Sequence, residues 1–416
     1  DAYNVAIGSL AGRYITTGQY NTLIGALAGD ALTSSNNNVA VGYEALTTDT
    51  QGTKSTAIGT AALKDQNQST NTDTNNTAVG YHAGTNVTTG TQNTIMGGEA
   101  GRSLTSGYQN TAIGRSALYN DTLGNYTVAV GREALYSQNF TTSTNTYNTA
   151  VGYKAGTSVT TGLNNTFIGG GAGDAITTGD ENIAIGRDAL SSDDLGSRSV
   201  AVGMNALRNL NYSTSTNSYN TAVGHNAGDD LTTGVENTFV GGLAGDSLQD
   251  ADDNVAIGYL SLSADTFGSR TVAIGFNALR NQNFSTATNS YNTAIGYNAG
   301  DDVTTGVENT IVGGLGGDSL TTGSYNVAIG SQALSEDDLG SHSVAIGRMA
   351  LQSQNYATAT NSYNVAVGSN AGSQITTGIY NTLVGGLAGD ALTDADYNVA
   401  IGANALGQNT VGSRSV

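Results

Sequence analysis

The chain has 416 residues and a formal net charge of −19 at pH 7, because 33 Asp and Glu outnumber 14 Lys and Arg. This acidic balance argues against a nucleic-acid-binding protein. The sequence contains no Cys and no Pro, which excludes disulfides and thiolate metal sites and suits a backbone committed to hydrogen-bond ladders. No apolar run approaches ~18 residues, so we expect no transmembrane helix and no membrane contact within this segment.

A five-residue phrase, Asn-x-x-x-Gly, returns from one end of the chain to the other, as at Asn292–Gly296. It has 23 copies, and the spacing of their glycines cycles through 17, 17, 17 and 21, which gives a 72-residue super-repeat. Regular self-similarity of this kind indicates a solenoid rather than several globular domains. The chain opens inside one repeat and stops inside another, so we expect a segment of a longer fibre protein.

Each super-repeat contains four types of turn in a constant order. The first reads Gly-x-x-Ala-Gly and then an aliphatic residue and Thr-Thr-Gly, as at 296–306. The second carries a large residue two positions before its glycine, and the third and fourth carry Ala-Leu in place of Ala-Gly. The fourth also has a four-residue insertion within a stretch rich in Ser, Thr and Asn, as at 285–291.

The local pattern predicts strands and turns. Val39 and Val41 bracket Ala40 with the period of two that is typical of a strand. Gly and Asn recur too often for helix interiors, but they suit turns that need positive φ. We therefore predict an all-β fold: a parallel β-solenoid of 17-, 17-, 17- and 21-residue coils, running as a single continuous array over 1–416.

Compensating substitutions support the stacking of these turns. Where the residue two before the glycine is large, the residue after the glycine shrinks to Ala or Gly, so each turn keeps a similar apolar volume. The large residues are Leu23, Ile95, Phe167, Phe239, Ile311 and Leu383.

The asparagine that opens the phrase is present in 18 of the 23 copies and is Ser or Thr in the other five, all of the fourth type. Amides stacked on identical amides can hydrogen-bond along a ladder, so we assign this column a structural role. Its central members are Asn148, Asn165, Asn182, Asn220, Asn237, Asn254, Asn292, Asn309 and Asn326.

The phrases at Asn254–Gly258 and Ser199–Gly203 resemble the repeats of the YadA-type head of trimeric autotransporter adhesins. The stretch Asn292–Ala299 is similar to repeats in many phage and viral tail-fibre proteins. The resemblance covers the whole chain. It implies a left-handed parallel β-roll, a homotrimer, an extracellular place on a cell or virion surface, and attachment to a host-cell or other receptor that the sequence does not identify.

Catalytic and metal chemistry have weak support in the sequence. The three histidines, His82, His225 and His342, occupy two different positions of the repeat, which favours plain surface residues. The carboxylates form no acid–base constellation, and we expect no cofactor. Calcium is the one open alternative, because adjacent carboxylates on turns are typical ligands of hard cations. The pairs are Asp193–Asp194, Asp229–Asp230, Asp252–Asp253, Asp301–Asp302 and Asp337–Asp338.

Two columns are candidates for contact or packing. The residue just before the phrase asparagine is large and often aromatic, so it is either a contact stripe or a tolerant solvent-facing column. Its candidate contact residues are Tyr219, Arg270, Tyr291, Tyr325, Tyr363, Tyr380 and Tyr397. Near the insertion, an aromatic residue aligns with leucine of the third turn type, which favours a cap on the core. These aromatics are Phe140, Tyr212, Phe284 and Tyr356.

The leading functional hypothesis is an extracellular structural fibre or adhesin shaft that forms a surface filament, mediates attachment and has no catalytic activity. A phage or viral tail-fibre shaft for host recognition is the alternative. Ice binding by threonine arrays would need threonines on consecutive turns, whereas Thr-x-Thr, as at Thr142–Thr144, occurs only once in each super-repeat. A polysaccharide-active β-solenoid enzyme would need a local carboxylate cluster, which is absent from the sequence pattern.

Overall fold

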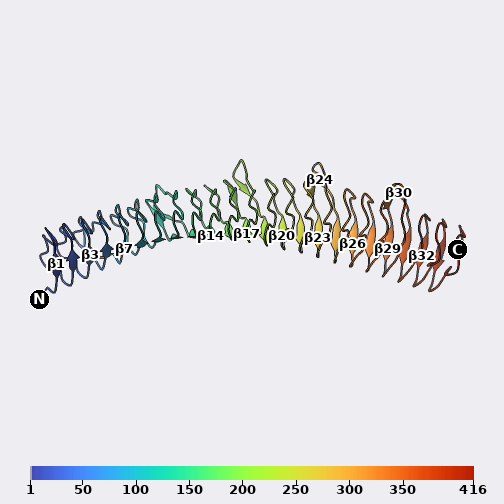
Figure 1. Ribbon diagram of the computed structural model, residues 1–416, viewed down its shortest axis with the longest axis horizontal. Helices are drawn as coiled ribbons and strands as arrows, with labels where there is room; N and C mark the ends of the chain where they lie inside the picture. The colour runs from blue at the N-terminus through green and yellow to red at the C-terminus, as the bar shows by residue number, and fades with distance from the viewer. Residues whose placement is uncertain (1) are drawn as a thin grey trace. The chain divides into compact units, whose positions relative to one another are not determined.

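The computed structural model describes residues 2–416 and is all-β (Figure 1). The chain forms a parallel β-solenoid of about 23 turns, built from ~17-residue coils. Residues 2–416 contain no helix that could cross a membrane.

The first compact unit comprises Asp1–Met204 and Asn211–Asn217. Its parallel sheet consists of three-residue strands, and two-residue strands form three further pairs. The strands of the sheet are β1 (Val5–Ile7), β2 (Thr22–Ile24), β3 (Val39–Val41), β5 (Thr56–Ile58), β7 (Thr77–Val79), β8 (Thr94–Met96), β9 (Thr111–Ile113), β11 (Val128–Val130), β13 (Thr149–Val151), β14 (Thr166–Ile168), β15 (Ile183–Ile185) and β17 (Val200–Val202). The pairs are β4 (Gly52–Thr53) with β6 (Thr72–Asp73), β10 (Gly124–Asn125) with β12 (Thr144–Asn145), and β16 (Gly196–Ser197) with β18 (Thr216–Asn217).

The second compact unit comprises Asn205–Leu210 and Ser218–Val416 and is built in the same way. The strands of its sheet are β19 (Thr221–Val223), β20 (Thr238–Val240), β21 (Val255–Ile257), β23 (Val272–Ile274), β25 (Thr293–Ile295), β26 (Thr310–Val312), β27 (Val327–Ile329), β29 (Val344–Ile346), β31 (Val365–Val367), β32 (Thr382–Val384) and β33 (Val399–Ile401). The pairs are β22 (Gly268–Ser269) with β24 (Thr288–Asn289) and β28 (Gly340–Ser341) with β30 (Thr360–Asn361). A single continuous array over 1–416 stays a prediction.

The strands pair in the register that the repeat predicts. Val39 lies opposite Thr56, which holds the same place in the next turn, and Thr56 lies opposite Thr77 across a longer, fourth-type turn. Backbone hydrogen bonds between turns continue outside the strands, for example from the Gly29 amide to the Ala45 carbonyl at 2.9 Å. Like residues therefore stack on like residues around each turn.

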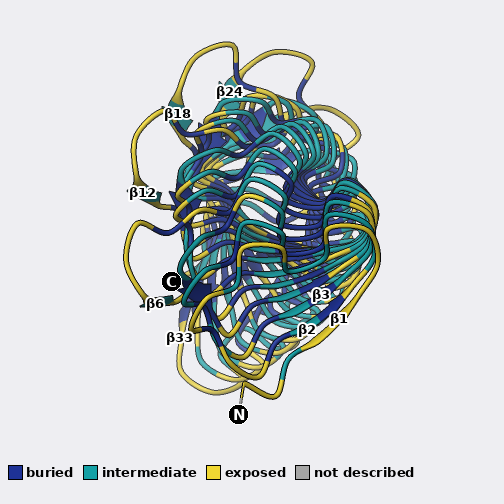
Figure 2. Ribbon diagram, turned by 90° about the vertical axis from the view of Figure 1, so that its left-hand side faces the viewer, coloured by how far each residue is buried: buried dark blue, intermediate teal, exposed yellow. Residues whose placement is uncertain are grey.

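The middle residue of nearly every three-residue strand points inward and is buried, while its two neighbours point outward. The predicted compensation of volumes does not occur at the residue after the phrase glycine, because a Cβ added to Gly242 would meet the Tyr259 side chain and not Phe239. Phe239 is fully buried, and a Cβ added to Gly228 or Gly245 would meet its ring at 2.7 or 2.6 Å. Glycine at these positions therefore makes room for the large side chain. Figure 2 shows the buried residues inside the coil and the insertions as exposed loops near β6, β12 and β24.

Many turn residues other than glycine have positive φ, which the sequence pattern did not indicate. The leucine of Ala-Leu is an example: Leu46 and Leu279 are fully buried at φ 54° and 48°. In the first turn type, glycine holds the same conformation, as at Gly12 with φ 60°. The side chain must therefore gain more from burial than the left-handed conformation costs, about 1–2 kcal/mol.

Candidate functional surfaces

The asparagine column is a buried ladder that joins side chains to backbone. In the first unit, the Asn165 backbone N–H donates to Asn148 Oδ1 at 2.9 Å, and Asn165 Nδ2 donates to the Gly179 carbonyl at 2.8 Å. Asn182 continues the ladder by donating its backbone N–H to Asn165 Oδ1 at 2.9 Å. Each side chain thus supplies a donor and an acceptor to buried backbone groups.

The second unit holds the same ladder. Direct contact between side-chain amides occurs as well, since Asn237 Nδ2 donates to Asn220 Oδ1 at 3.2 Å. The bond from Nδ2 to a backbone carbonyl recurs at the other column members, all buried, which are Asn220, Asn254, Asn292, Asn309 and Asn326.

The four-residue insertion repairs this ladder where asparagine is missing. Thr271 replaces asparagine in one fourth-type turn, and its hydroxyl lies 2.6 Å from the Ser290 hydroxyl at the end of the following insertion. Ser290 Oγ then accepts the Asn292 backbone N–H at 3.2 Å, and Gln282 Oε1 accepts from Asn292 Nδ2 at 2.8 Å. Ser290 in the insertion and Gln282 just before it therefore supply the acceptors that the shorter side chain cannot.

A buried carboxylate completes this network in most repeats and was missed by the sequence analysis. Asp265 Oδ2 accepts from Gln282 Nε2 at 2.6 Å, and Asp265 Oδ1 accepts the Gly268 N–H at 3.1 Å. Burial raises the pKa of Asp265. The signal was the shared 72-residue period of Asp49, Asp121, Asp193, Asp265 and Asp337 with Gln66, Gln138, Gln282 and Gln354.

One repeat departs from this pattern. Leu210 stands where the other repeats carry glutamine. Asp193 is fully buried, and its Oδ2 has no hydrogen-bond partner among residues 2–416. Burial, with a smaller effect from the neighbouring Asp194, raises the pKa of Asp193 to about 6, against an ordinary value of 3.8.

Replacing Asp193 with Asn is expected to stabilise the protein near neutral pH but not at pH ~4. A carboxyl group with a raised folded-state pKa favours folding below its unfolded pKa, and this contribution is lost as pH rises through about 6. The asparagine side chain of the variant carries no charge to desolvate. Its advantage in the free energy of unfolding therefore grows as pH rises from the unfolded pKa to the folded pKa, and reaches about 1–3 kcal/mol. Thermal unfolding of the parent protein and of Asp193→Asn from pH 4 to 8 measures this difference in stability.

Asp265→Asn is the matched control, and it should destabilise the protein at pH 7 instead of stabilising it. Its Oδ2 accepts from Gln282, and an amide nitrogen in that place would face another donor. Equal effects of the two substitutions at pH 7 would contradict the assignment of Asp193 as the unsatisfied member.

The candidate contact column is exposed and lies beside the strands of the second unit. Tyr219, Tyr291, Tyr325, Tyr363, Tyr380 and Tyr397 are 42–53% exposed. Arg270 lies over the Tyr291 ring at 6.0 Å and pairs with Asp253 at 3.4 Å. All of these column residues have positive φ, between 49° and 61°. These side chains therefore point outward from a left-handed backbone conformation just before each strand.

Five rings of this column form an unbroken stack. Centroids are 4.9 Å apart from Tyr325 to His342 and from His342 to Tyr363, 5.3 Å from Tyr363 to Tyr380, and 5.0 Å from Tyr380 to Tyr397. The rings lie nearly parallel, within 16°. Their faces are therefore covered by one another, and the surface presents ring edges and hydroxyl groups.

A second outward column is continuously aliphatic. The residue just before the phrase glycine is Ile, Val or Met in every copy. Side chains such as Ile24, Ile58 and Met96 in the first unit are 36–41% exposed, and Val223 and Ile295 in the second unit are 37% and 38% exposed. Contiguous apolar surface of this kind is typical of an interaction site. The sequence pattern predicted these residues only as members of strands and not as an exposed column.

The adjacent carboxylates face different partners. Asp301 is held by Arg280 through two contacts of 2.9 and 3.0 Å, whereas Asp302 Oδ1 accepts from Asn281 Nδ2 at 2.9 Å. The Asp229–Asp230 pair repeats this arrangement with Arg208 and Asn209.

The remaining pairs are divided in the same way. Asp337 lies in the buried network, and Asp338 accepts from Thr321. Asp252 accepts the Val235 N–H at 2.8 Å, while Asp253 pairs with Arg270. Asp193 is buried, whereas Asp194 accepts from Thr177. Within residues 2–416 no group of three or more metal-ligating side chains converges. Calcium binding stays a hypothesis, which is tested by comparing thermal unfolding with and without a chelator.

The aromatic residues at the insertion and the histidines have defined places in the structure. The aromatics at the insertion, predicted to cap the core, are confirmed as buried, since Phe140, Tyr212, Phe284 and Tyr356 are 4–6% exposed. His342 belongs to the ring stack, and His82 Nδ1 lies 3.0 Å from Thr85 Oγ1.

No protein-family description matches this sequence, and no characterised protein matches it significantly.

Proposed function

We propose that the chain forms the shaft of an extracellular structural fibre that mediates attachment at a cell or virion surface and has no catalytic activity. In this proposal three copies associate along their length, each coil is left-handed, and 17-, 17-, 17- and 21-residue coils repeat in that order. The alternative within this proposal is a phage or viral tail-fibre shaft that serves host recognition.

The observation that carries this proposal is the aliphatic column before the phrase glycines. A coil as thin as this buries little apolar surface per residue. The outward face of each unit's sheet still exposes an aliphatic side chain in every turn, as at Ile295 and Ile329, which are 38% and 37% exposed. Lateral contact with another copy covers that face in every turn at once, because the repeat is the same along the chain.

Replacing Ile295 and Ile329 with Lys is expected to abolish association at micromolar concentration while the β circular dichroism stays unchanged. Each lysine places a charge on the face that association would bury. Light scattering after size exclusion should give three times the mass of one chain for the parent protein and a single chain for the variant. A parent protein that is monomeric at every concentration would refute the proposed assembly.

Thr286→Lys serves as the control, because Thr286 is an exposed insertion residue away from this column. It adds the same charge and should leave the mass unchanged. Electron microscopy of the parent protein is expected to show elongated particles, and compact globules would contradict a fibre.

A further inference from the structure

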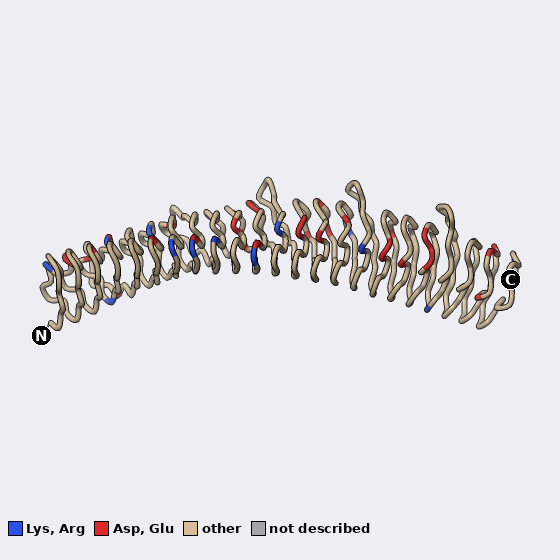
Figure 3. The backbone as a smooth tube through the Cα atoms, in the orientation of Figure 1, with Lys and Arg blue, Asp and Glu red and all other residues tan. Residues whose placement is uncertain are grey.

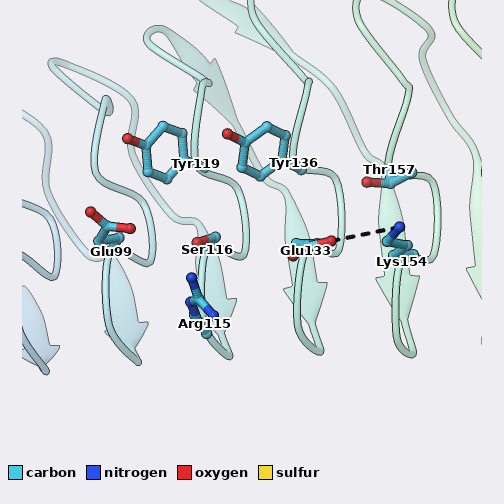
Figure 4. Close-up of a pocket in the computed structure, with 8 residues that line it drawn as sticks. All are labelled: Glu99, Arg115, Ser116, Tyr119, Glu133, Tyr136, Lys154 and Thr157. Atoms are coloured by element: carbon cyan, nitrogen blue, oxygen red, sulfur yellow. Dashed lines mark ion pairs between the residues drawn. The ribbon is translucent and has the colours of Figure 1, made fainter.

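A shallow pocket of about 310 Å³ opens on the first unit, on four consecutive turns that follow β8, β9, β11 and β13 (Figure 4). Tyr119 and Tyr136 form one side, and Arg115, Glu133 and Lys154 lie on the other. The charged residues lie one or two residues after their phrase glycines, and the two tyrosines lie five residues after theirs. The constant offset between turns is what brings residues of successive turns into one site.

The two tyrosines form a half-buried aromatic surface. Their ring centroids are 5.1 Å apart and their planes differ by 15°. Figure 4 shows the rings on neighbouring turns with both hydroxyl groups pointing the same way. Tyr119 is held in place, because Arg102 Nη1 donates to its hydroxyl at 3.0 Å and also pairs with Glu99 at 2.9 Å. The pocket thus combines two stacked aromatic rings, one of them held by Arg102, with two hydroxyl groups.

Basic side chains are concentrated around this pocket in an otherwise acidic protein, although the carboxylates of Glu99 and Glu133 line it as well. Four of the chain's 14 basic residues, Arg102, Arg115, Arg132 and Lys154, fall on these turns, and Figure 3 shows basic residues on successive turns in this stretch. Glu133 is shared between Arg132, at 2.9 Å, and Lys154, at 4.0 Å. Arg115 is exposed and forms no ion pair within the described residues. Its guanidinium therefore has its donors available for an added anion.

We propose that this pocket binds an acidic polysaccharide through Arg115, Lys154 and the tyrosine pair. A guanidinium with free donors suits a carboxylate or sulfate group. Aromatic rings with hydroxyl groups suit a ligand with both apolar C–H faces and polar edges. A pocket of this volume fits one or two sugar rings. The opening along successive turns allows a chain to continue beyond it.

The proposal deepens the proposed role in attachment and rests on it, because it names the chemistry that the fibre would recognise. Bulk attraction does not account for such binding, since a protein of net charge −19 repels a polyanion. Local geometry must supply the affinity, and substitutions outside the pocket should leave it unchanged.

The test is a calorimetric titration of the full chain with three polymers at low salt: polygalacturonate, which is carboxylated, dextran sulfate, and neutral dextran. Binding of either acidic polymer but not of dextran is expected, and the two acidic arms distinguish carboxylate from sulfate. Affinity should fall as salt is added. Binding to neither acidic polymer, or equal binding to dextran, would overturn the proposal.

Arg115→Gln and Tyr136→Ala should each weaken binding about tenfold. Arg348→Gln is the matched control, because Arg348 follows its phrase glycine as Arg115 does and is also exposed, but has Gln352 where Arg115 has Tyr119. It should change the affinity by less than about twofold. Equal losses from both arginine substitutions, or none from Tyr136→Ala, would show adventitious charge binding only and overturn the site.

Light scattering on the same samples separates this inference from the proposed assembly. If the protein binds an acidic polymer but is monomeric, the proposed pocket stands and the proposed assembly is refuted. If the protein is assembled but binds no acidic polymer, the proposed assembly stands and the pocket is refuted.

Discussion

Gly97→Ala is expected to open the solenoid locally and to cost about 3–5 kcal/mol, whereas Gly98→Ala, one residue later, is expected to be neutral or slightly stabilising. A Cβ on Gly97 would lie 2.6 Å from the carbonyl carbon and oxygen of Gly114 in the next turn. Gly97 also has φ +133°, a conformation that other residues rarely adopt. A Cβ on Gly98 would meet nothing within 4 Å.

The obstacle at Gly97 is backbone, so no side chain can move aside. Relief requires the two turns to separate, which breaks bonds between them such as that from the Gly114 amide to the Met96 carbonyl at 2.7 Å. A shift of Gly97 would also disturb its bond to the preceding turn, from its amide to the Val79 carbonyl at 2.8 Å. The same close approach recurs at nearly every phrase glycine, for example 2.3 Å between a Cβ on Gly258 and the Gly275 oxygen. It explains why the spacing of the phrase is kept so strictly.

Hydrogen exchange is the appropriate measurement, because a solenoid opens locally rather than as one cooperative unit. Amides of β7, β8 and β9 should lose protection in Gly97→Ala and keep it in Gly98→Ala, while amides near β2 stay unchanged in both variants. Similar exchange in the two variants would mean that turn stacking does not depend on the phrase glycine.

Asn237→Ala is expected to destabilise the second unit by about 2–5 kcal/mol, because it leaves two buried backbone groups without partners. Asn237 Nδ2 donates to the Ala251 carbonyl at 2.8 Å, and Asn237 Oδ1 accepts the Asn254 N–H at 3.0 Å. Asn237 itself is fully buried, so water does not replace these bonds. Thermal unfolding and exchange of the Asn254 amide measure the loss.

Two further substitutions sharpen this prediction. Asn289→Ala removes an exposed amide in β24 and should change stability by less than about 0.5 kcal/mol. Asn237→Ser should not restore the ladder, although serine stands at this position in some fourth-type turns. There the insertion supplies a second hydroxyl, as Ser362 does for Ser343 at 2.6 Å, and the turn after Asn237 has no insertion. Full stability in Asn237→Ser would contradict the role of the insertion.

The repeat determined much of this protein directly from its sequence. The alternation at Val39, Ala40 and Val41 indicated the inward and outward faces of a strand, and the spacing of the glycines gave the register that pairs Val39 with Thr56. These features depend on contacts between equivalent positions, so one period describes them all.

Tertiary structure decided what depends on contacts between unlike positions. The partnership of Asp265 with Gln282 and the repair of the ladder by Ser290 join different columns across a fourth-type turn. The pocket at Tyr119, Tyr136 and Arg115 likewise needs the angle at which each bend leaves its strand. The repeat period predicts which residues stack on one another. Only the folded backbone determines which columns face each other, because the direction of a side chain depends on φ and ψ and not on spacing in the sequence.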